Sequence, residues 1–299
     1  MRTKDHQIES FKNKMKNRGR LLIQCPDQPG IVAAVSQFLF ENGANIMESN
    51  QFSTNPEGGT FFIRIEFECQ DLLERKSSLQ ENFAKIAETF SMEWKLTFVH
   101  DLKKTAIFVS KELHCLRELL WEWESGELIT DISFVISNHT EAKELVESFG
   151  IPFVHIPMSK DNKRQAEEKQ LQLLQEYEVE TIILARYMQI LSPDFVEAHP
   201  FKIINIHHSF LPAFVGARPY DRAYQRGVKI IGATSHYVTN ELDEGPIIEQ
   251  DIIRVDHRDH ADDLKKTGRS IERSVLARAV KWHLQDRVIV YGNKTIVFN

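Results

Sequence analysis

The sequence predicts two domains of different class: an amino-terminal ferredoxin-like βαββαβ domain (α+β) and a carboxy-terminal Rossmann-like α/β domain with a mostly parallel sheet. Early in the chain, strands of alternating apolar and polar residues are separated by two amphipathic helical segments. Further along, short apolar runs alternate with helical stretches, as in parallel sheets covered by helices. With 299 residues, 42% of them hydrophobic, the chain is long enough for two cores.

The start of the chain is expected to be a polar extension. Residues 1–19 are rich in Lys, Asn and Arg and contain no apolar run of the length that a signal peptide or a membrane span requires. We therefore expect a solvated, frayed extension at 1–19, a first domain at 20–100 and a second domain at 104–299. The polar stretch Asp101–Lys104 is the expected junction between the domains.

The elements of the first domain follow from changes in hydrophobic period and from turn residues. The strand at 61–67 alternates most regularly, because its odd-numbered residues are apolar whereas Arg64 and Glu66 stand between them. We expect the odd face of this strand in the core and the even face in water. In chain order, we expect a strand at 21–25, a helix at 31–39, strands at 46–53 and 61–67, a helix at 72–90 and a strand at 94–98.

The second domain is predicted from five apolar runs separated by helical stretches. Crossovers between parallel strands are right-handed, and ligands of such sheets bind beyond the carboxyl ends of the strands. Polar residues just after these runs are therefore the first candidates for chemistry. The expected parallel strands are at 105–109, 131–136, 153–156, 181–184 and 203–206, with a further strand at 233–238.

Composition narrows the expected partners and the compartment. The 37 basic and 43 acidic residues are interspersed and give a formal net charge of −6, so nucleic acid is not an expected partner, and neither is a membrane. The cysteines Cys25, Cys69 and Cys115 lie far apart and lack the spacing of a zinc or redox motif. This pattern favours a reducing compartment, and we expect a cytoplasmic protein.

Side chains that could carry chemistry follow the apolar run at 203–204. Asn205 and His207 stand two residues apart, so in an extended segment they lie on the same side. Asp243 stands in a turn-rich loop after the next predicted strand. Taken alone, each of these residues is more often structural than catalytic, so the surrounding motifs decide the interpretation.

The surrounding motifs resemble the formyltransferase superfamily that uses 10-formyltetrahydrofolate. Within that superfamily, the His207-His208 pair and the segments 216–220 and 232–238 look like those of the formyltetrahydrofolate deformylases. The resemblance spans the second domain and implies a formyltransferase fold there. Three motifs carry the superfamily resemblance, at Ala185–Ser192 (ARYMQILS), Asn205–Pro212 (NIHHSFLP) and Leu242–Pro246 (LDEGP).

The resemblance implies hydrolysis of 10-formyltetrahydrofolate to formate and tetrahydrofolate, which supplies formate for purine synthesis and balances the one-carbon pool. The folate and water are then the substrates, and neither a cofactor nor a metal is expected. Asn205 and His207 are expected to stabilise the tetrahedral oxygen, and Asp243 to orient His207 or a water and to promote deprotonation of the water. Whether His208 or His236 shares this role stays open. The residues expected at the pterin are Met188, Gln189, Ile190, Leu191, Thr239, Leu242 and Glu244.

The first domain resembles an ACT domain, the small-ligand sensor with which deformylases of this family begin. The βαββαβ order and the Pro26–Gly30 loop carry this resemblance. The loop opens a predicted helix whose first N–H groups can receive a carboxylate, while Asp27 can take an ammonium. We expect glycine or methionine to bind there and to change the catalytic rate, and pairing between such domains implies a homo-oligomer. The expected effector-binding residues are Asp27, Gln28, Gly30 and Ile31.

Three other functions stay open. A formyltransferase to an amine acceptor is disfavoured because Ser110–Cys115 lacks the glycine turn that would hold an acceptor phosphate, although Lys111 can bind an anion by charge alone. A non-catalytic folate or amino-acid sensor would not need the three candidate catalytic residues. A metallohydrolase is disfavoured because the H-E-x-x-H motif is absent and His257 and His260 belong to a polar loop.

Overall fold

The computed structural model has two compact units, which meet in sequence between Leu102 and Lys103. The break lies inside the stretch expected as the junction, and the last four residues, Ile296–Asn299, group with the amino-terminal unit. Of the sequence features, the motif residues 216–218 and the turn residue Pro56 lie outside the described residues. The structure describes residues 2–55, 57–213 and 219–299.

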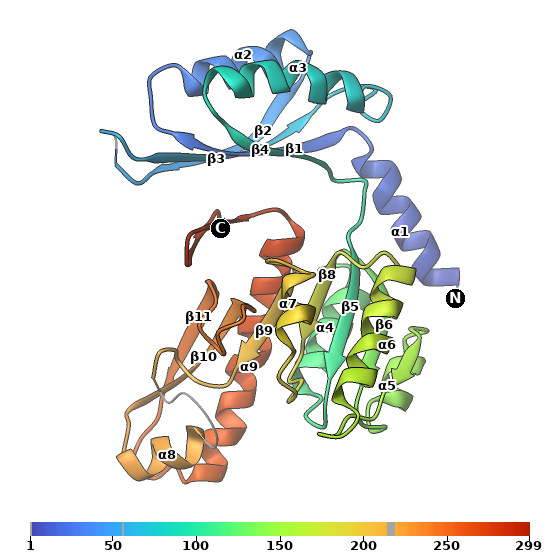
Figure 1. Cartoon of the computed structure of the whole chain (residues 1–299), viewed down its shortest axis with the longest axis vertical. Helices are drawn as coiled ribbons and strands as arrows, with labels where there is room; N and C mark the ends of the chain where they lie inside the picture. Colours follow the sequence, from blue (N-terminus) through green and yellow to red (C-terminus); the bar gives the residue numbers. More distant parts are fainter. Residues whose placement is uncertain (1, 56, 214–218) are drawn as a thin grey trace. The chain divides into compact units, whose positions relative to one another are not determined.

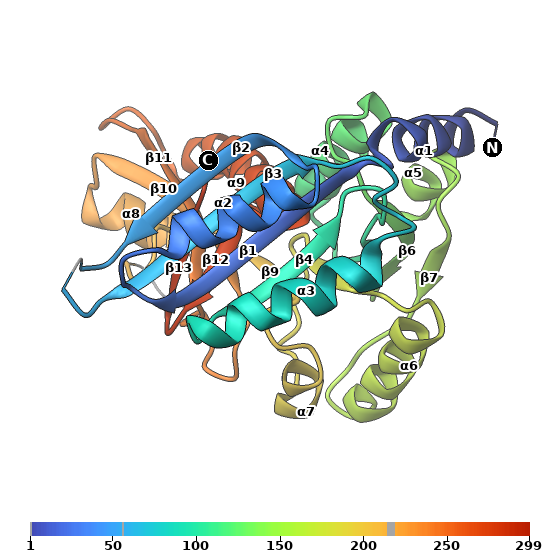
Figure 2. The same cartoon turned by 90° about the horizontal axis from the view of Figure 1, so that it is seen from above.

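The amino-terminal unit is a four-stranded antiparallel sheet with helices α2 and α3 on one face (Figures 1 and 2). The strand order β2-β3-β1-β4 in a βαββαβ chain confirms the predicted ferredoxin-like fold. The core between sheet and helices includes Val35, Phe38 and Phe83, as the apolar periodicity predicts. Its elements are α1 (Arg2–Met15), β1 (Arg18–Pro26), α2 (Ile31–Glu41), β2 (Asn45–Ser53), β3 (Thr60–Glu68), α3 (Lys76–Thr89) and β4 (Glu93–Phe98).

Two parts of this unit differ from the expectation at its helices. Residues 2–15 form helix α1 instead of a frayed extension, because they contain several good helix formers and neither Gly nor Pro before Gly19. Helix α3 begins later than expected, at Lys76. Leu72, which was expected on its apolar face, lies in the preceding turn and is buried all the same.

The expectation that the even face of β3 lies in water is wrong at two positions. Phe62 and Arg64 are both fully buried, with exposed fractions of 0%. The Phe62 ring stacks on that of Phe52, with the ring centroids 6.4 Å apart. The Arg64 guanidinium pairs with the carboxylates of Glu48 and Glu66, each at 3.0 Å. A buried cation persists only when it is paired in this way, and alternation alone does not predict the pairing.

The carboxy-terminal unit is built on a seven-stranded sheet of order β11-β10-β9-β8-β5-β6-β7. Strands β9, β8, β5, β6 and β7 are parallel, and β10 and β11 run antiparallel at one edge, which confirms the mostly parallel sheet. Its elements, with the small β12-β13 sheet, are β5 (Lys104–Val109), α4 (His114–Ser125), β6 (Asp131–Ser137), α5 (Lys143–Ser148), β7 (Phe153–His155), α6 (Lys163–Glu176), β8 (Thr181–Leu184), α7 (Pro193–Glu197), β9 (Ile203–His207), α8 (Pro219–Arg226), β10 (Ile230–Tyr237), β11 (Ile247–Arg254), α9 (Ala261–Leu284), β12 (Val288–Tyr291) and β13 (Lys294–Val297).

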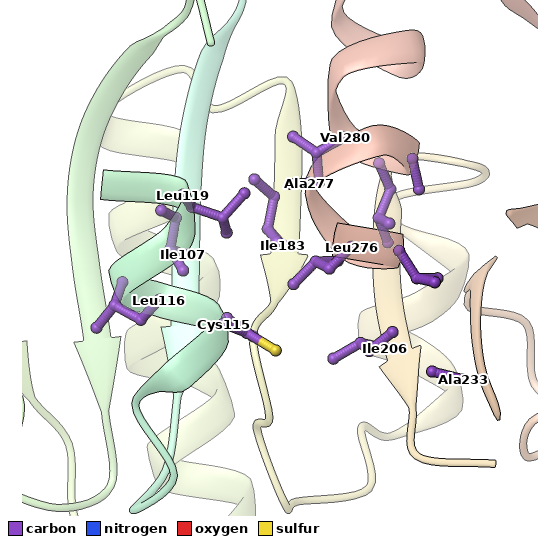
Figure 3. Close-up of a cluster of buried hydrophobic side chains, with 14 of the residues drawn as sticks. Ile107, Cys115, Leu116, Leu119, Ile183, Ile206, Ala233, Leu276, Ala277 and Val280 are labelled. Atoms are coloured by element: carbon purple, nitrogen blue, oxygen red, sulfur yellow. The ribbon is translucent and has the colours of Figure 1, made fainter. Parts of the chain in front are cut away.

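Helices cover both faces of this sheet and bury two cores. Helices α4 and α9 pack on one face, where Leu116, Leu119 and Val280 meet Ile107 and the neighbouring strands (Figure 3). Helices α6 and α7 pack on the other face. Full burial of each such aliphatic side chain contributes about 1.5–3 kcal/mol relative to exposure. The two cores hold the carboxyl ends of the strands in fixed positions, and the cavity described below lies there.

Helix α9 is the longest helix in the described ranges and runs for 24 residues. Its buried residues, including Leu264, Ile271, Val275 and Leu276, recur at helical spacing, and the remaining face is charged. Within residues 2–55, 57–213 and 219–299, no helix has both the length and the apolar content needed to span a membrane.

Candidate active site

A cavity of about 460 Å³ opens at the carboxyl ends of β8 and β9. The chain order reverses beside it, since β5 has β6 on one side and β8 on the other, and α/β proteins bind ligands at such a point. The volume falls in the range of small-molecule sites. The lining residues come from the ends of β8, β9 and β10, from the segments that follow β8 and β10, and from α7: Leu184, Arg186, Tyr187, Met188, Gln189, Ile190, Leu191, Val196, Asn205, Ile206, His207, His208, His236, Val238, Thr239, Asn240, Leu242 and Asp243.

An imidazole and a carboxylate meet on the wall of this cavity. His207 Nδ1 lies 3.1 Å from Asp243 Oδ2, and the His207 side chain is only 7% exposed. The carboxylate can only accept, so Nδ1 carries the proton in the neutral ring and Nε2 presents a lone pair. In the described part of the chain, Nε2 is buried and has no hydrogen-bond partner. This nitrogen is therefore free to exchange a proton with a ligand.

A second histidine joins the amide to the carboxylate. His236 Nε2 lies 3.3 Å from Asn205 Nδ2 and 3.7 Å from Asp243 Oδ1. Its Nδ1 lies 2.9 Å from the carbonyl oxygen of Tyr237, which can only accept. The Nδ1–H of His236 is therefore the donor to that carbonyl, and the neutral ring accepts the Asn205 N–H at Nε2. His236 thus fixes the orientation of the Asn205 amide. The sequence alone did not indicate this contact.

The charges in the site follow from burial and from these contacts. Burial acts to raise the pKa of Asp243, but the hydrogen bond from His207 and the nearby His236 ring outweigh it and hold the pKa below its usual range. Asp243 is therefore ionised at neutral pH. Burial, and then the Arg186 charge, lower the pKa of His208 to about 4, so the His208 ring is neutral at neutral pH.

The backbone around Asp243 is tightly constrained. Asp243 has a φ of 58°, in the left-handed region that non-glycine residues rarely adopt. At Gly245 an added Cβ would lie 1.9 Å from the carbonyl oxygen of Tyr237, so only glycine fits there. Asn293 Nδ2 donates to the Glu244 carbonyl oxygen at 3.0 Å, which ties the loop to the segment after β12. The loop therefore holds its carboxylate in one place.

Six of the seven residues expected at the pterin line the cavity. The side chains of Met188, Ile190 and Leu242 are more than half exposed, as suits residues that pack on a flat ring. The remaining one, Glu244, is exposed and is not among the described residues that line the cavity. Tyr187 and Val238, which belong to the recognised motifs, also line the cavity, as do Val196 and Asn240, which no motif indicated.

Outside this cavity, one group of side chains has the composition of a metal site. Ligand atoms of His114, Cys115 and Glu272 lie within 4.8 Å of one another. However, His114 Nε2 already lies 2.7 Å from Glu272 Oε2. Burial also raises the pKa of the Cys115 thiol well above its usual range, whereas a metal binds the thiolate. The group is better described as a hydrogen-bonded core cluster.

The expected effector residues lie together in the loop between β1 and α2 and at the first residue of α2. Asp27 Oδ2 accepts a hydrogen bond from the Ser53 hydroxyl, and Gln28 is exposed. Gly30 is the N-cap of α2 with a φ of 97°, and it has no side chain to bond the first N–H groups of the helix. Ile31 points into the core and is 2% exposed, so it can offer a ligand only its backbone.

Comparison with known proteins decides the family. A family model described as "Formyl transferase" matches residues 103–280, and one described as "ACT domain" matches residues 19–83. The formyltetrahydrofolate deformylase of Bacillus subtilis (strain 168) is 67% identical over 292 residues, which cover 98% of this chain and 97% of that protein. The chain belongs to the formyltetrahydrofolate deformylase family. Both domain types that the motifs predicted are thereby confirmed.

Solved structures agree with membership of the deformylase family. A crystal structure of a formyltetrahydrofolate deformylase from Pseudomonas syringae pv. tomato has a TM-score of 0.90 at 45% identity and covers 99% of this chain and 100% of its own. Glycinamide ribonucleotide transformylase 1 from Symbiobacterium toebii has a TM-score of 0.62 at 27% identity and covers 66% of this chain and 95% of its own. Similarity to the deformylase structure therefore extends over both units, whereas similarity to the transformylase stops at two thirds of the chain.

Proposed function

We propose that the protein hydrolyses 10-formyltetrahydrofolate to formate and tetrahydrofolate. The observation that carries this proposal is the contact of His207 with the ionised Asp243 on the cavity wall, with the Asn205 amide oriented beside them. These groups match what acyl transfer from nitrogen to water needs: a base, an orienting carboxylate and oxyanion donors. The relatives that match the chain over nearly its full length carry the same activity in their names.

We propose that the pterin packs against the apolar side chains of Met188, Ile190 and Leu242 and is bound by main-chain groups of the same segments. In this arrangement the formyl group lies near His207 and Asn205, which line the same cavity. The other lining residues expected at the pterin are Gln189, Leu191 and Thr239.

The chemistry uses one proton relay. Water attacks the formyl carbon, its proton goes to His207 Nε2, and the new tetrahedral oxygen accepts hydrogen bonds from Asn205 and the protonated His207. Asp243 stabilises the positive charge that the ring gains. As the C–N bond breaks, His207 returns the proton to the folate nitrogen. The products are tetrahydrofolate and formic acid, which loses its proton to solvent.

Acceptor-free turnover tests the proposal. Purified protein incubated with 10-formyltetrahydrofolate alone is expected to release formate and tetrahydrofolate in equal amounts. A protein that consumes the substrate only when an amine is added, and then yields the formylated amine, is a transferase instead. If the protein binds folate but shows almost no turnover with or without an amine, a non-catalytic sensor is the remaining function.

We propose that no cofactor takes part and that chelators leave the rate unchanged to within about twofold. The proposed oxyanion donors are an amide and an imidazole, and His207 Nδ1 is already bound to Asp243. The measurement is the rate of formate release before and after dialysis against EDTA. Loss of activity that zinc or iron specifically restores contradicts this prediction.

We propose that the amino-terminal unit is a regulatory domain that binds glycine or methionine at the loop between β1 and α2. The uncapped start of α2 suits the carboxylate of an amino acid, and Asp27 suits its ammonium. Calorimetry is expected to show binding of one of these amino acids with a parallel change in formate release. Coupling of about 1–3 kcal/mol changes an apparent affinity roughly five- to a hundredfold.

Replacing Asp27 by alanine is expected to abolish both the binding heat and the change in rate, because the ammonium loses its only proposed counter-charge. The matched control is Asp101→Ala, which removes an exposed carboxylate of the same unit that pairs with Lys76. If none of a panel of amino acids gives heat or changes the rate in the parent, the unit serves assembly alone.

We propose that the chain forms a homo-oligomer in the cytoplasm, with a regulatory domain at 20–100 and a catalytic domain at 104–299. Strand β2 is an edge strand and exposes Ile46, Met47 and Phe52, and apolar edge strands favour pairing. All three cysteines are buried free thiols, which suits a reducing compartment. Light scattering of the parent and of a Met47→Lys variant tests the pairing.

A further inference from the structure

A second cavity, of about 660 Å³, adjoins the candidate active site. Arg186 and His208 line both cavities, so they form the boundary between them. Lys265 and Arg269 of α9 also line the second cavity, and each lies within ion-pair distance of a carboxylate, at 3.4 and 2.9 Å. Lys265 and Arg269 are thus already paired with carboxylates. The cation that remains among the described lining residues is Arg186, at the boundary between the two cavities.

Arg186 at this boundary has unused hydrogen-bond donors. Its side chain is 12% exposed, and Nε lies 3.4 Å from Glu272 Oε2. Despite this distance, neither Nε nor Nη1 has a hydrogen-bond partner in the part of the chain that the structure describes. The carbonyl oxygen of Arg186 accepts from the Ser110 backbone N–H at 3.3 Å, which fixes the residue after β8. Buried donors without partners are costly, so the guanidinium is suited to receive an acceptor.

Glu272 balances the charge of Arg186 but does not accept hydrogen bonds from Arg186 Nε or Nη1. Its two oxygens already accept from His114 Nε2 and from the Tyr220 hydroxyl, each at 2.7 Å. Burial acts to raise the pKa of Glu272, but the His114 hydrogen bond and the Arg186 charge keep it below its usual value, so it is ionised. The Arg186–Glu272 pair therefore carries no net charge. A small anion can bind to it, and the site without an anion contains no uncompensated buried cation.

We propose that Arg186 and His208 form a binding subsite for the formate product, a small carboxylate, at the inner end of the second cavity. The inference rests on the proposed function. Hydrolysis leaves one negative charge on formate next to the ionised Asp243, so the two anions repel each other. A guanidinium offers two parallel N–H donors to a carboxylate, and the neutral His208 ring offers one more N–H. Formate can then leave through the second cavity while tetrahydrofolate still occupies the first.

The test measures formate binding directly, without folate and without turnover, so that it is independent of the hydrolysis assay. Carbon-13 formate is titrated with the full-length protein and followed by NMR line width. The parent is expected to bind formate saturably, and Arg186→Lys, which loses the planar fork, is expected to bind at least about tenfold more weakly. The double variant Arg186→Met with Glu272→Gln keeps the buried charge balanced and is expected to bind equally weakly. Arg273→Gln, which removes a cation of α9 outside the cavity, is the matched control.

A second measurement uses the parent protein alone. In the parent labelled with nitrogen-15 histidine, formate is expected to shift the ring resonances of His208, whereas His199, whose ring is bound to the Phe195 carbonyl oxygen, is expected to stay unchanged. The proposal is overturned if formate shows no saturable binding to the parent, if it binds without moving His208, or if the Arg186 variants bind it like the parent. Formate binding in a protein that fails the hydrolysis assay would instead overturn the proposed function alone.

Discussion

Replacing Asp243 with asparagine is expected to lower turnover at least about 100-fold while folding and folate affinity are retained. Asparagine has nearly the same shape, so the loop at φ 58° keeps its contacts. The uncharged amide, however, cannot stabilise the imidazolium of His207, and its NH₂ group can stabilise the wrong tautomer of the ring. The loss is therefore expected in kcat, with KM nearly unchanged.

The pH dependence of this variant carries further information. The pKa of Asp243 lies below its usual range, so the parent carboxylate loses its charge only at pH values below about 4. The variant is therefore expected to be slower than the parent throughout the range from about pH 5 to 8. Asp161→Asn, an exposed residue outside the cavity, is the control. Turnover of Asp243→Asn within about threefold of the parent would rule out the assigned role, since such contributions are typically 100-fold or more.

Replacing His207 with alanine is expected to lower turnover about 100- to 10,000-fold, because the proton relay and one oxyanion donor are lost together. Folate binding is expected to persist, since the apolar side chains at the cavity mouth are untouched. Formate release under single-turnover conditions, with folate affinity measured separately by fluorescence, gives both quantities.

His236→Ala and His208→Ala separate the alternatives to His207. His236→Ala is expected to cost less than His207→Ala, because His236 acts through the orientation of Asn205. His208 is neutral at neutral pH and lies on the boundary of the cavity, so its loss is also expected to be the smaller one. Near-normal activity of His207→Ala together with inactivity of either other variant would transfer the catalytic role to that histidine.

The strands β1 to β10 follow from local patterns that the sequence displays, whereas α1, β11, β12 and β13 were not predicted. The alternation of β3 and the apolar runs of the parallel strands predict the strands because burial on one or both faces requires those residues. The pairing of Asn205 with His207 on one side of β9 is likewise a property of an extended chain, and both line the same cavity. The catalytic roles of these residues stay predictions until the variants are measured.

What the sequence does not predict depends on contacts between distant residues. Arg64 is buried because two carboxylates of its own sheet pair with it, and no period reveals that. Arg186 stands in a recognised motif. That its N–H donors lack partners beside Glu272 follows only from the fold, because Glu272 is far away in the sequence. Glu244 was expected at the pterin from its neighbours in sequence, but in the folded loop it is exposed and is not among the described residues that line the cavity.

The origin of the formate oxygen tests the central claim most directly. In water labelled with oxygen-18, hydrolysis by attack on the formyl carbon puts one solvent oxygen into each formate, and mass spectrometry of formate from a single turnover without any amine is expected to show one label per molecule. Formate that contains no solvent oxygen, or consumption of the substrate only after an amine is added, would contradict the account.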